Sequence, residues 1–306
     1  MSEPNRPLSG KPQDCSPASM APLRFRAPSL VLCGVLLLSA AGCGGGPAAL
    51  ILRQSSDSAT ATAPQPRLDP APFNAVLQAV VDAQGLVDYE TLQRDPAQLD
   101  RYLKELAALT PERFASWPEA DQIALLINAY NALTLRSIID HKPIRPSIKD
   151  IPGVWKFRRH ALMGQQLTLD GIEHEILRRE YNEPRIHAAL VCAAMSCPPL
   201  RGEAFTGAEL DRQLDNQSTR WLASSVGLKI DRANRTVGIS KIFDWFGEDW
   251  PRADPNAAPV PGHEQQSAIL RFIARYRPAE DQKLLLGGDY RLTHLPYDWS
   301  LNRSRS

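Results

Sequence analysis

Residues 116–140, SWPEADQIALLINAYNALTLRSIID, decide the fold of this chain. Apolar side chains cover nearly the whole circumference of a helix drawn through this stretch, and only a narrow sector is left for solvent. A helix that is apolar on all sides is typical of a protein interior. Ser116 and Glu119 are spaced as a capping box, and the helix should end before Pro143. We therefore predict a central, buried helix.

Two asparagines fall inside the apolar circumference of this helix, Asn128 and Asn131. A buried amide without partners costs about 1–3 kcal/mol, so both side chains should be hydrogen-bonded. They could fix the backbone of neighbouring loops, or one of them could face a pocket and orient a ligand or a histidine. Asn131 and its neighbour Tyr130 are therefore candidate ligand-binding residues.

Helix signals dominate from about residue 74 onward. We predict one α+β domain over residues 74–306, rich in helix and with short antiparallel hairpins; an arrangement like the papain/transglutaminase-type thiol fold is one option. The predicted elements are a helix capped by Asp95, two strands around Gly164, a helix capped by Thr168, helices over 206–224 and 265–278, a hairpin over 227–240 and an extended segment over 290–302.

The helix capped by Thr168 carries Asp170 and His174 four residues apart. Side chains at this spacing meet on one face of a helix. They form either a carboxylate–imidazole pair with a chemical role or an ordinary solvated pair.

The segment with the most chemistry is EPRIHAALVCAAMSCPPLR, residues 183–201. Pro184 can start a helix and Pro198 must end it, which places Cys192 inside the helix and Cys197 at its end. The two thiols could form a disulfide, but five residues of helix would hold their Cα atoms more than about 7 Å apart. Zinc ligation with His187 and His174 is a second option, although the spacing matches no finger or ribbon.

Cysteine chemistry offers two further interpretations of the same segment. Cys192 suits a buried structural cysteine, whereas Cys197 has the freedom to act as a reactive thiol assisted by a histidine.

The N-terminal part reads as a bacterial lipoprotein signal. In residues 20–43, MAPLRFRAPSLVLCGVLLLSAAGC, a basic stretch precedes a short apolar run, and small residues lead into Cys43. We expect Met20 to be the true start, residues 1–19 to be a leader upstream of it and residues 20–42 to be the signal peptide. Cys43 would carry the lipid, with ordinary secretion and an uncleaved anchor as the alternatives, and residues 43–73 would form a flexible tether.

Composition excludes several classes of protein. The 306 residues carry 35 basic and 34 acidic side chains, a formal charge of +1, which argues against a nucleic-acid partner. A hydrophobic content of 43% excludes a wholly disordered chain. No motif predicts a cofactor or a metal.

Several motifs in order resemble the domain of unknown function 547 family (DUF547). They are INAYNALTL, HALMGQQLTLDGIEHEILR, PRIHAALVCAAMSCPPLR, SKIFDWF and YDWSLN, and they span roughly residues 88–302. The resemblance implies a mixed α+β domain in which His174, His187, Cys197 and the pair Asp298–Trp299 recur. It implies no assigned activity.

Two functions from different classes follow. The first is a cysteine-dependent hydrolase or acyl transferase, in which Cys197 is the nucleophile, His187 or His174 the base, and Asp298 or Asn128 the group that orients the imidazole. The second is a non-catalytic envelope protein in which the same residues form a structural network.

The expected partners follow from the anchor and the candidate site. They are a membrane, reached through the lipid, and a small-molecule or peptide ligand, for which Arg185 is a further candidate contact. The expected location is the bacterial cell envelope, facing the periplasm, with the outer membrane preferred because Gly44 is not acidic.

Overall fold

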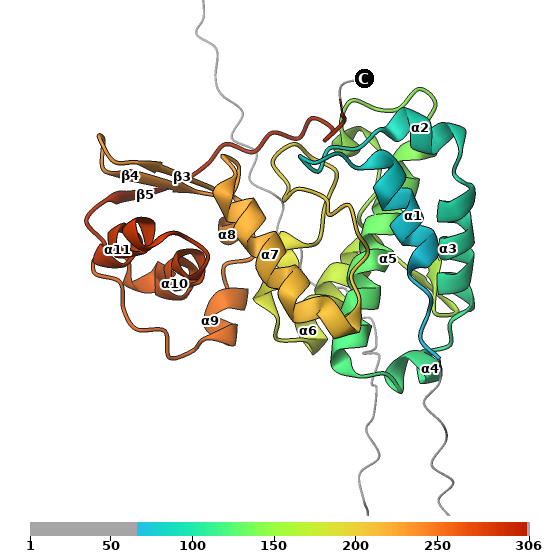
Figure 1. Ribbon diagram of the computed structural model, residues 1–306, viewed down its shortest axis with the longest axis horizontal. Helices are drawn as coiled ribbons and strands as arrows, with labels where there is room; N and C mark the ends of the chain where they lie inside the picture. The colour runs from blue at the N-terminus through green and yellow to red at the C-terminus, as the bar shows by residue number, and fades with distance from the viewer. Residues whose placement is uncertain (1–65, 305–306) are drawn as a thin grey trace, which may run out of the picture. The chain divides into compact units, whose positions relative to one another are not determined.

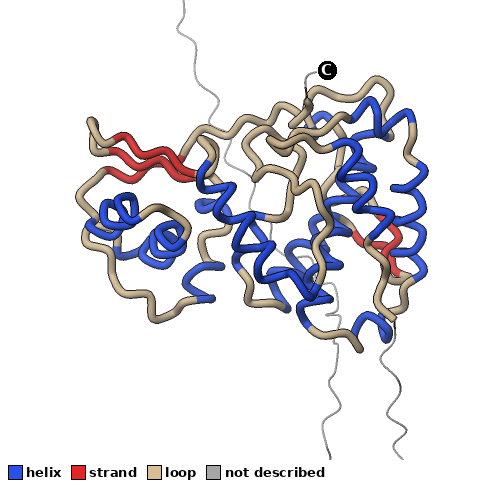
Figure 2. The backbone as a smooth tube through the Cα atoms, in the orientation of Figure 1, coloured by secondary structure: helices blue, strands red, loops and turns tan. Residues whose placement is uncertain are grey.

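The structure is a computed structural model that describes residues 66–304 (Figure 1). These residues belong to one compact unit. Helices and small sheets are mixed within it, which confirms the predicted α+β class (Figure 2). The signal peptide, the lipidated Cys43, most of the tether and the choice between Met1 and Met20 lie outside the described residues. Within residues 66–304, no helix combines the length and the apolarity needed to span a membrane.

Helix α5, Glu119–Ile139, is the central helix that the sequence predicts, and almost every side chain on it is buried. Helices α1 (Ala71–Val80) and α3 (Ala97–Ala108) pack against each other, and α3 also packs on α5. The predicted capping box at the start of α5 is wrong. The Ser116 hydroxyl instead donates to the Arg113 carbonyl, because Ser116 ends the short helix α4, Pro111–Ala115.

The other helices are shorter. They are α2 (Tyr89–Arg94), α6 (Arg178–Glu180), α7 (Leu210–Ala223), α8 (Ile242–Trp245), α9 (Asp249–Ala253), α10 (Ser267–Arg275) and α11 (Ala279–Gly287), together with a π-helical segment, Gly171–Leu177, and 3-10 turns at Ile148–Asp150, Pro184–Ala188, Gly207–Glu209 and Glu264–Gln266.

Both predicted hairpins are present. Strands β1 (His160–Leu162) and β2 (Gln165–Leu167) pair antiparallel around Gly164, which adopts a positive φ of 67° that glycine tolerates. Strands β3 (Leu228–Asp231) and β4 (Thr236–Ile239) also pair antiparallel. Part of the predicted extended segment is strand β5 (Arg291–His294), which lies parallel to β4 and completes a three-stranded sheet (Figure 2).

The apolar interior forms two clusters. The larger one surrounds α5 and includes α1 and α3, while the smaller one lies between the three-stranded sheet, α10 and the aromatic residues Trp221, Phe243 and Trp250. Tyr297 packs against both clusters. The segment that follows β5 therefore joins the two halves of the interior.

Two boundaries differ from the prediction. Phe73 was assigned to the tether but is fully buried on α1, so the folded part begins at or before Ala71. The predicted helix over residues 184–197 is wrong, since only the single turn Pro184–Ala188 forms and the chain then becomes irregular. Tertiary hydrogen bonds to this segment replace the helical ones, as described below.

His160 on β1 gives the fold a pH dependence. Burial, with a contribution from Arg158, lowers the pKa of His160 from 6.5 to about 4. Between these two values the unfolded chain binds a proton that the folded chain does not, so the free energy of unfolding should fall as the pH drops from 6.5 to 4. Urea unfolding across this range should show a smaller fall for His160→Gln. Profiles of the two proteins that stay parallel from pH 7 to pH 4 would contradict this assignment.

Candidate functional site

A cavity of about 180 Å³ lies where chemically active side chains from distant segments meet. Its walls combine sulfur, imidazole and carboxylate groups with a large aromatic surface. The lining residues are Tyr130, Trp155, Asp170, Glu173, His174, His187, Leu190, Cys192, Cys197, Ile242, Trp245, Phe246, Tyr297 and Trp299.

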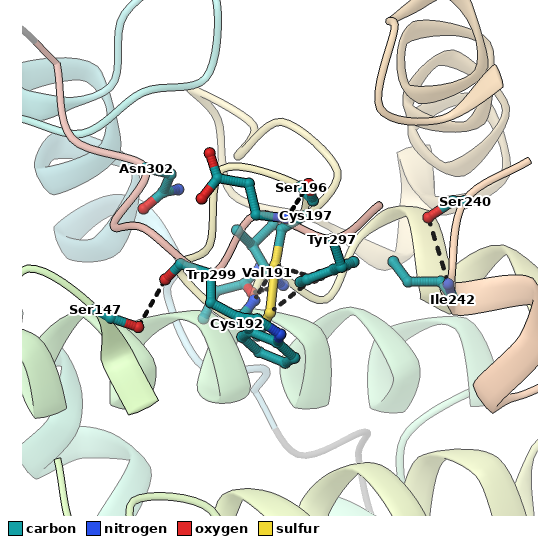
Figure 3. The surroundings of a disulfide bond; sticks show 12 residues. Ser147, Val191, Cys192, Ser196, Cys197, Ser240, Ile242, Tyr297, Trp299 and Asn302 are labelled. Atoms are coloured by element: carbon teal, nitrogen blue, oxygen red, sulfur yellow. Dashed lines mark hydrogen bonds between the residues drawn. A yellow bond between two sulfur atoms is a disulfide. The ribbon is translucent and has the colours of Figure 1, made fainter. Parts of the chain in front are cut away.

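Cys192 and Cys197 form a disulfide on the wall of this cavity (Figure 3). Their Cα atoms lie 6.3 Å apart, within bonding range, so the expectation that a helix would keep them apart is wrong. The backbone between them is not helical, and Ala193 adopts a positive φ of 62°. That turn brings the two thiols together.

Cys197 is the better hydrogen-bonded of the two sulfurs. Its Sγ accepts the backbone N–H of Cys192 at 3.2 Å and lies 3.2 Å from the Tyr297 hydroxyl. The same hydroxyl lies 3.3 Å from the Sγ of Cys192, so Tyr297 bridges the disulfide (Figure 3). Cys197 is only 5% exposed, whereas Cys192 is half-buried. An incoming reagent therefore reaches Cys192 more easily.

Asn131 fixes the segment that leads into the disulfide. Its side-chain N–H donates to the Ala189 carbonyl at 2.9 Å, and its oxygen accepts the Val191 N–H at 2.9 Å. Both backbone groups would otherwise be buried without partners, because this segment makes no helix. The two hydrogen bonds of the Asn131 amide thus replace those that a helix or strand would supply to the backbone just before Cys192.

The chain after Tyr297 holds the other side of the disulfide loop. Ala194 forms an antiparallel bridge with Leu301, and the Met195 N–H donates to the Ser300 carbonyl at 2.8 Å. The Asn302 N–H donates to the Ala193 carbonyl at 3.0 Å. The loop is therefore clamped between α5 and residues 298–302.

His187 and Asp249 form a buried imidazole–carboxylate pair, with Nε2 of His187 2.7 Å from Oδ2 of Asp249. The ring of His187 stacks on Phe246 and Trp250 at centroid distances of 4.6 and 5.2 Å. Burial would raise the pKa of the Asp249 carboxyl, but hydrogen bonds from His187 and Arg178 lower it well below its usual range. The carboxylate is therefore charged, and it orients the imidazole at the cavity wall.

Arg178 joins this pair to the second histidine. Its guanidinium binds Asp249 through two nitrogens, at 2.7 and 3.1 Å, and donates to Nδ1 of His174 at 2.9 Å. Nε2 of His174 lies 3.3 Å from Asp170, so the predicted Asp170–His174 pair is present. Burial lowers the pKa of His174, but Asp170 and Glu173 outweigh it and raise the pKa overall. Protonation of His174 would break its bond to Arg178.

Residues 114–222 match the family model described as "Protein of unknown function, DUF547". A DUF547 domain is therefore present. The match is shorter than the predicted span of 88–302. Among the predicted site residues, it contains Asn128, Asn131, His174, His187, Cys192 and Cys197. Neither the curated proteins nor the solved structures include a match to the chain. The papain/transglutaminase-like arrangement stays a prediction.

The cavity takes up some of the predicted site residues. Cys197, His187, His174 and Tyr130 line it, and Asn131 supports it from α5. Within the described residues, hydrogen bonds to the two sulfurs come from Tyr297 and from the backbone of Cys192, and none comes from an imidazole.

Three other predicted residues have different roles. Asn128 binds the backbone N–H and carbonyl of Phe205, so it fixes a loop, which is the structural option left open by the sequence. The Asp298 carboxylate accepts the Ser300 N–H and hydroxyl and does not orient a histidine. Arg185 is outside the cavity lining and pairs with Glu183 and with the α7 residues Asp211 and Asp215.

The zinc option does not fit this geometry, because the two sulfurs are bonded to each other. Across residues 66–304, no group of three or more His, Cys, Asp or Glu side chains is placed to hold a metal ion.

Sequence reasoning missed Asp249 and Tyr297. Asp249 lies in GEDW, outside the motifs that carry the family resemblance, and Tyr297 directly precedes the Asp298–Trp299 pair of the YDWSLN motif. A signal for Tyr297 was therefore present, since its motif had already been singled out. No local pattern marked Asp249, because its partners are 62 and 71 residues away along the chain.

Asn131 and Asn128 offer a matched test of the clamp on the disulfide. Each Ala substitution leaves one buried backbone N–H and one carbonyl without a partner, so each should lower the free energy of unfolding by about 2–4 kcal/mol. Only Asn131→Ala should speed reduction of the disulfide by dithiothreitol, since Asn128 holds a different loop. Equal reduction rates in the two variants would show that Asn131 does not control the disulfide.

Proposed function

We propose that the DUF547 domain carries out thiol–disulfide exchange through the Cys192–Cys197 pair. The observation that carries this proposal is the surroundings of the Cys197 sulfur, which already has two hydrogen-bond donors beside it, the Cys192 N–H and the Tyr297 hydroxyl. Donors at these positions stabilise a thiolate, and a stabilised leaving thiolate makes a disulfide react faster. A disulfide that only braces a fold needs neither a cavity nor such donors.

The reaction balances as a two-electron exchange. An incoming thiolate attacks Sγ of the more exposed Cys192, the S–S bond breaks, and Cys197 leaves as a thiolate with the bonding electron pair. A second thiolate then attacks the incoming sulfur of the mixed disulfide and releases the Cys192 thiolate. Two external thiols are oxidised to one disulfide, and the protein gains two thiols. The reverse sequence on a disulfide substrate restores the Cys192–Cys197 bond.

The buried His187–Asp249 pair favours a second candidate, cysteine-dependent hydrolysis or acyl transfer. His187 lines the same cavity as Cys197 and is oriented by a charged carboxylate. In the dithiol form, Cys197 would attack an acyl carbon to form a thioester while His187 protonates the departing amine or alcohol. Water or an acceptor would then release the acyl group and restore the thiol.

The proposed setting is the bacterial cell envelope, with the domain held on a membrane by a lipid on Cys43 and facing the periplasm. The support is the sequence of residues 20–43 and the preference for the outer membrane drawn from Gly44. An oxidising compartment is also where a protein disulfide persists. The proposed ligand is a small molecule or peptide that carries a thiol or a disulfide.

Serine variants distinguish the two candidate reactions. Wild-type protein should be reduced by 2-mercaptoethanol about tenfold or more faster than oxidised glutathione under the same conditions. In Cys197→Ser treated with 2-hydroxyethyl disulfide, the Cys192 thiolate should attack that disulfide and release one 2-mercaptoethanol, and peptide mapping should find a stable mixed disulfide on Cys192. Cys192→Ser should lose exchange entirely, but it would retain any acyl-transfer activity of Cys197.

The outcome that contradicts both reactions is equally clear. A disulfide that resists 2-mercaptoethanol until the protein unfolds, with no thiol-dependent hydrolysis of a nitrophenyl ester after reduction, would favour the non-catalytic envelope protein.

Tyr297→Phe tests the role of the hydroxyl. The variant keeps the aromatic ring but removes one of two donors beside Cys197, so reduction by 2-mercaptoethanol should slow by about tenfold, the effect of losing about 1.4 kcal/mol of hydrogen bonding to a charged leaving group. Tyr290→Phe is the control, since its hydroxyl binds the Leu285 carbonyl away from the cavity. An unchanged rate in Tyr297→Phe would mean that this hydroxyl does not assist the leaving sulfur.

A further inference from the structure

The aromatic wall of the cavity is larger than disulfide chemistry requires. Trp155, Trp245, Tyr297 and Trp299 form a connected group of rings with centroids 4.6–5.9 Å apart. Trp245 and Trp299 stack at an interplanar angle of 24°, whereas the other pairs meet at 50–70°, so the four rings do not form one flat stack. Trp245 is 41% exposed, although apolar surface of this size is usually covered.

One of these rings already lies beneath a positive charge. The Nζ atom of Lys149 lies 5.2 Å from the ring centroid of Trp299, within the range of a cation–π contact. Arg178 makes a similar contact with Phe246, another lining residue, at 4.8 Å. The faces of the rings in this region therefore suit cations.

Two carboxylates line the same cavity. Asp170 and Glu173 both line it, and Asp170 is paired with His174 and lies in the field of Lys156. The positive charge of Arg178 is matched by Asp249 and Glu248. Glu173 is half-buried, is hydrogen-bonded to the Tyr130 side chain, and interacts electrostatically with His174 and Arg178. A carboxylate on the wall of a cavity attracts a cation that enters it, so Asp170 and Glu173 favour a cationic ligand over an anionic one.

We propose that this cavity binds a substituted ammonium group, with the rings of Trp155, Trp245, Tyr297 and Trp299 around the cation and Glu173 as its counter-charge. Aromatic rings with a nearby carboxylate are the combination that recognises alkylated ammonium ions. The volume of about 180 Å³ suits a compact cation of this kind. Asp170 and Glu173 would repel an anionic ligand.

This inference adds a substrate class to the proposed function. The substrate class rests on that function. The disulfide and the aromatic rings share one cavity, so a bound ammonium group would place a thiol on the same small molecule beside Cys192. The substrate class is then a thiol or disulfide that carries an alkylammonium group.

Binding can be tested apart from the chemistry, with the disulfide intact. Isothermal titration of the wild-type protein should show choline binding about tenfold more tightly than 3,3-dimethyl-1-butanol, the uncharged molecule of the same shape. Glu173→Gln should lower the affinity for choline by about fivefold or more, and Trp245→Leu should lower it as well. Glu175→Gln is the matched control, because Glu175 lies on the same helical segment but is exposed and pairs with Arg179. Its affinity for choline should equal that of the wild type.

Equal affinities for choline and the alcohol, no binding of either, or an unchanged affinity in Glu173→Gln would overturn the ammonium proposal. Thermal unfolding of each variant would show whether a lost affinity reflects a lost fold, and Glu175→Gln sets the reference for that comparison.

A kinetic comparison links the ammonium site to exchange. For each thiol, the rate with the protein disulfide is divided by the rate with oxidised glutathione. This normalised rate should be higher for cysteamine, which carries an ammonium group, than for 2-mercaptoethanol. The normalised rate of cysteamine divided by that of 2-mercaptoethanol should fall to about one in Glu173→Gln. If choline binds but neither thiol reduces the protein, the ammonium site stands and thiol–disulfide exchange fails. If both thiols react with no preference and choline does not bind, exchange stands and the ammonium site fails.

Discussion

The two hydrogen bonds of Asn131 are the constraint on which the candidate site depends. The segment after Pro184 gives up helical hydrogen bonds, and a buried backbone can do so only where other partners exist. Asn131 supplies them for Ala189 and Val191 from the most deeply buried helix of the protein. Because α5 is packed on nearly all sides, the amide cannot move, and the position of Cys192 follows from it.

A second fixed point is the charge of Asp249. A carboxylate that is only 2% exposed is tolerable when several donors surround it, and here Arg178 and His187 supply them. The same contacts join helix α6, the 3-10 turn of His187 and helix α9, which are separate elements along the chain. Both histidines are thus held by one buried charge, which explains how side chains 13 residues apart come to share a cavity wall.

The sequence was informative where structure is decided locally. A stretch that is apolar on nearly all sides and ends before Pro143 located α5, and the turn at Gly164 located a hairpin. The need to satisfy two buried amides identified Asn128 and Asn131 as hydrogen-bonded residues. It misled where distant segments compete with local preference. Residues 188–197 contain many good helix formers, yet they bind α5 and residues 298–302 instead. The carboxylate that orients His187 was sought at Asp298 and is Asp249, a choice that only the folded chain reveals.

The contact between Tyr297 and the disulfide has a consequence for the order of assembly. Tyr297 is separated from Cys197 by 100 residues, whereas the two cysteines are five residues apart. Because synthesis proceeds from the N-terminus, both thiols emerge well before the residue that bridges them, and closing the longer loop costs more chain entropy. Until the chain reaches Tyr297, the Cys192–Cys197 pair therefore lacks the hydroxyl that covers it and is open to solvent and to other proteins. Tyr297 and Trp299 are the last of the cavity's lining residues to be added to the chain, so the aromatic wall is completed only after both cysteines are in place.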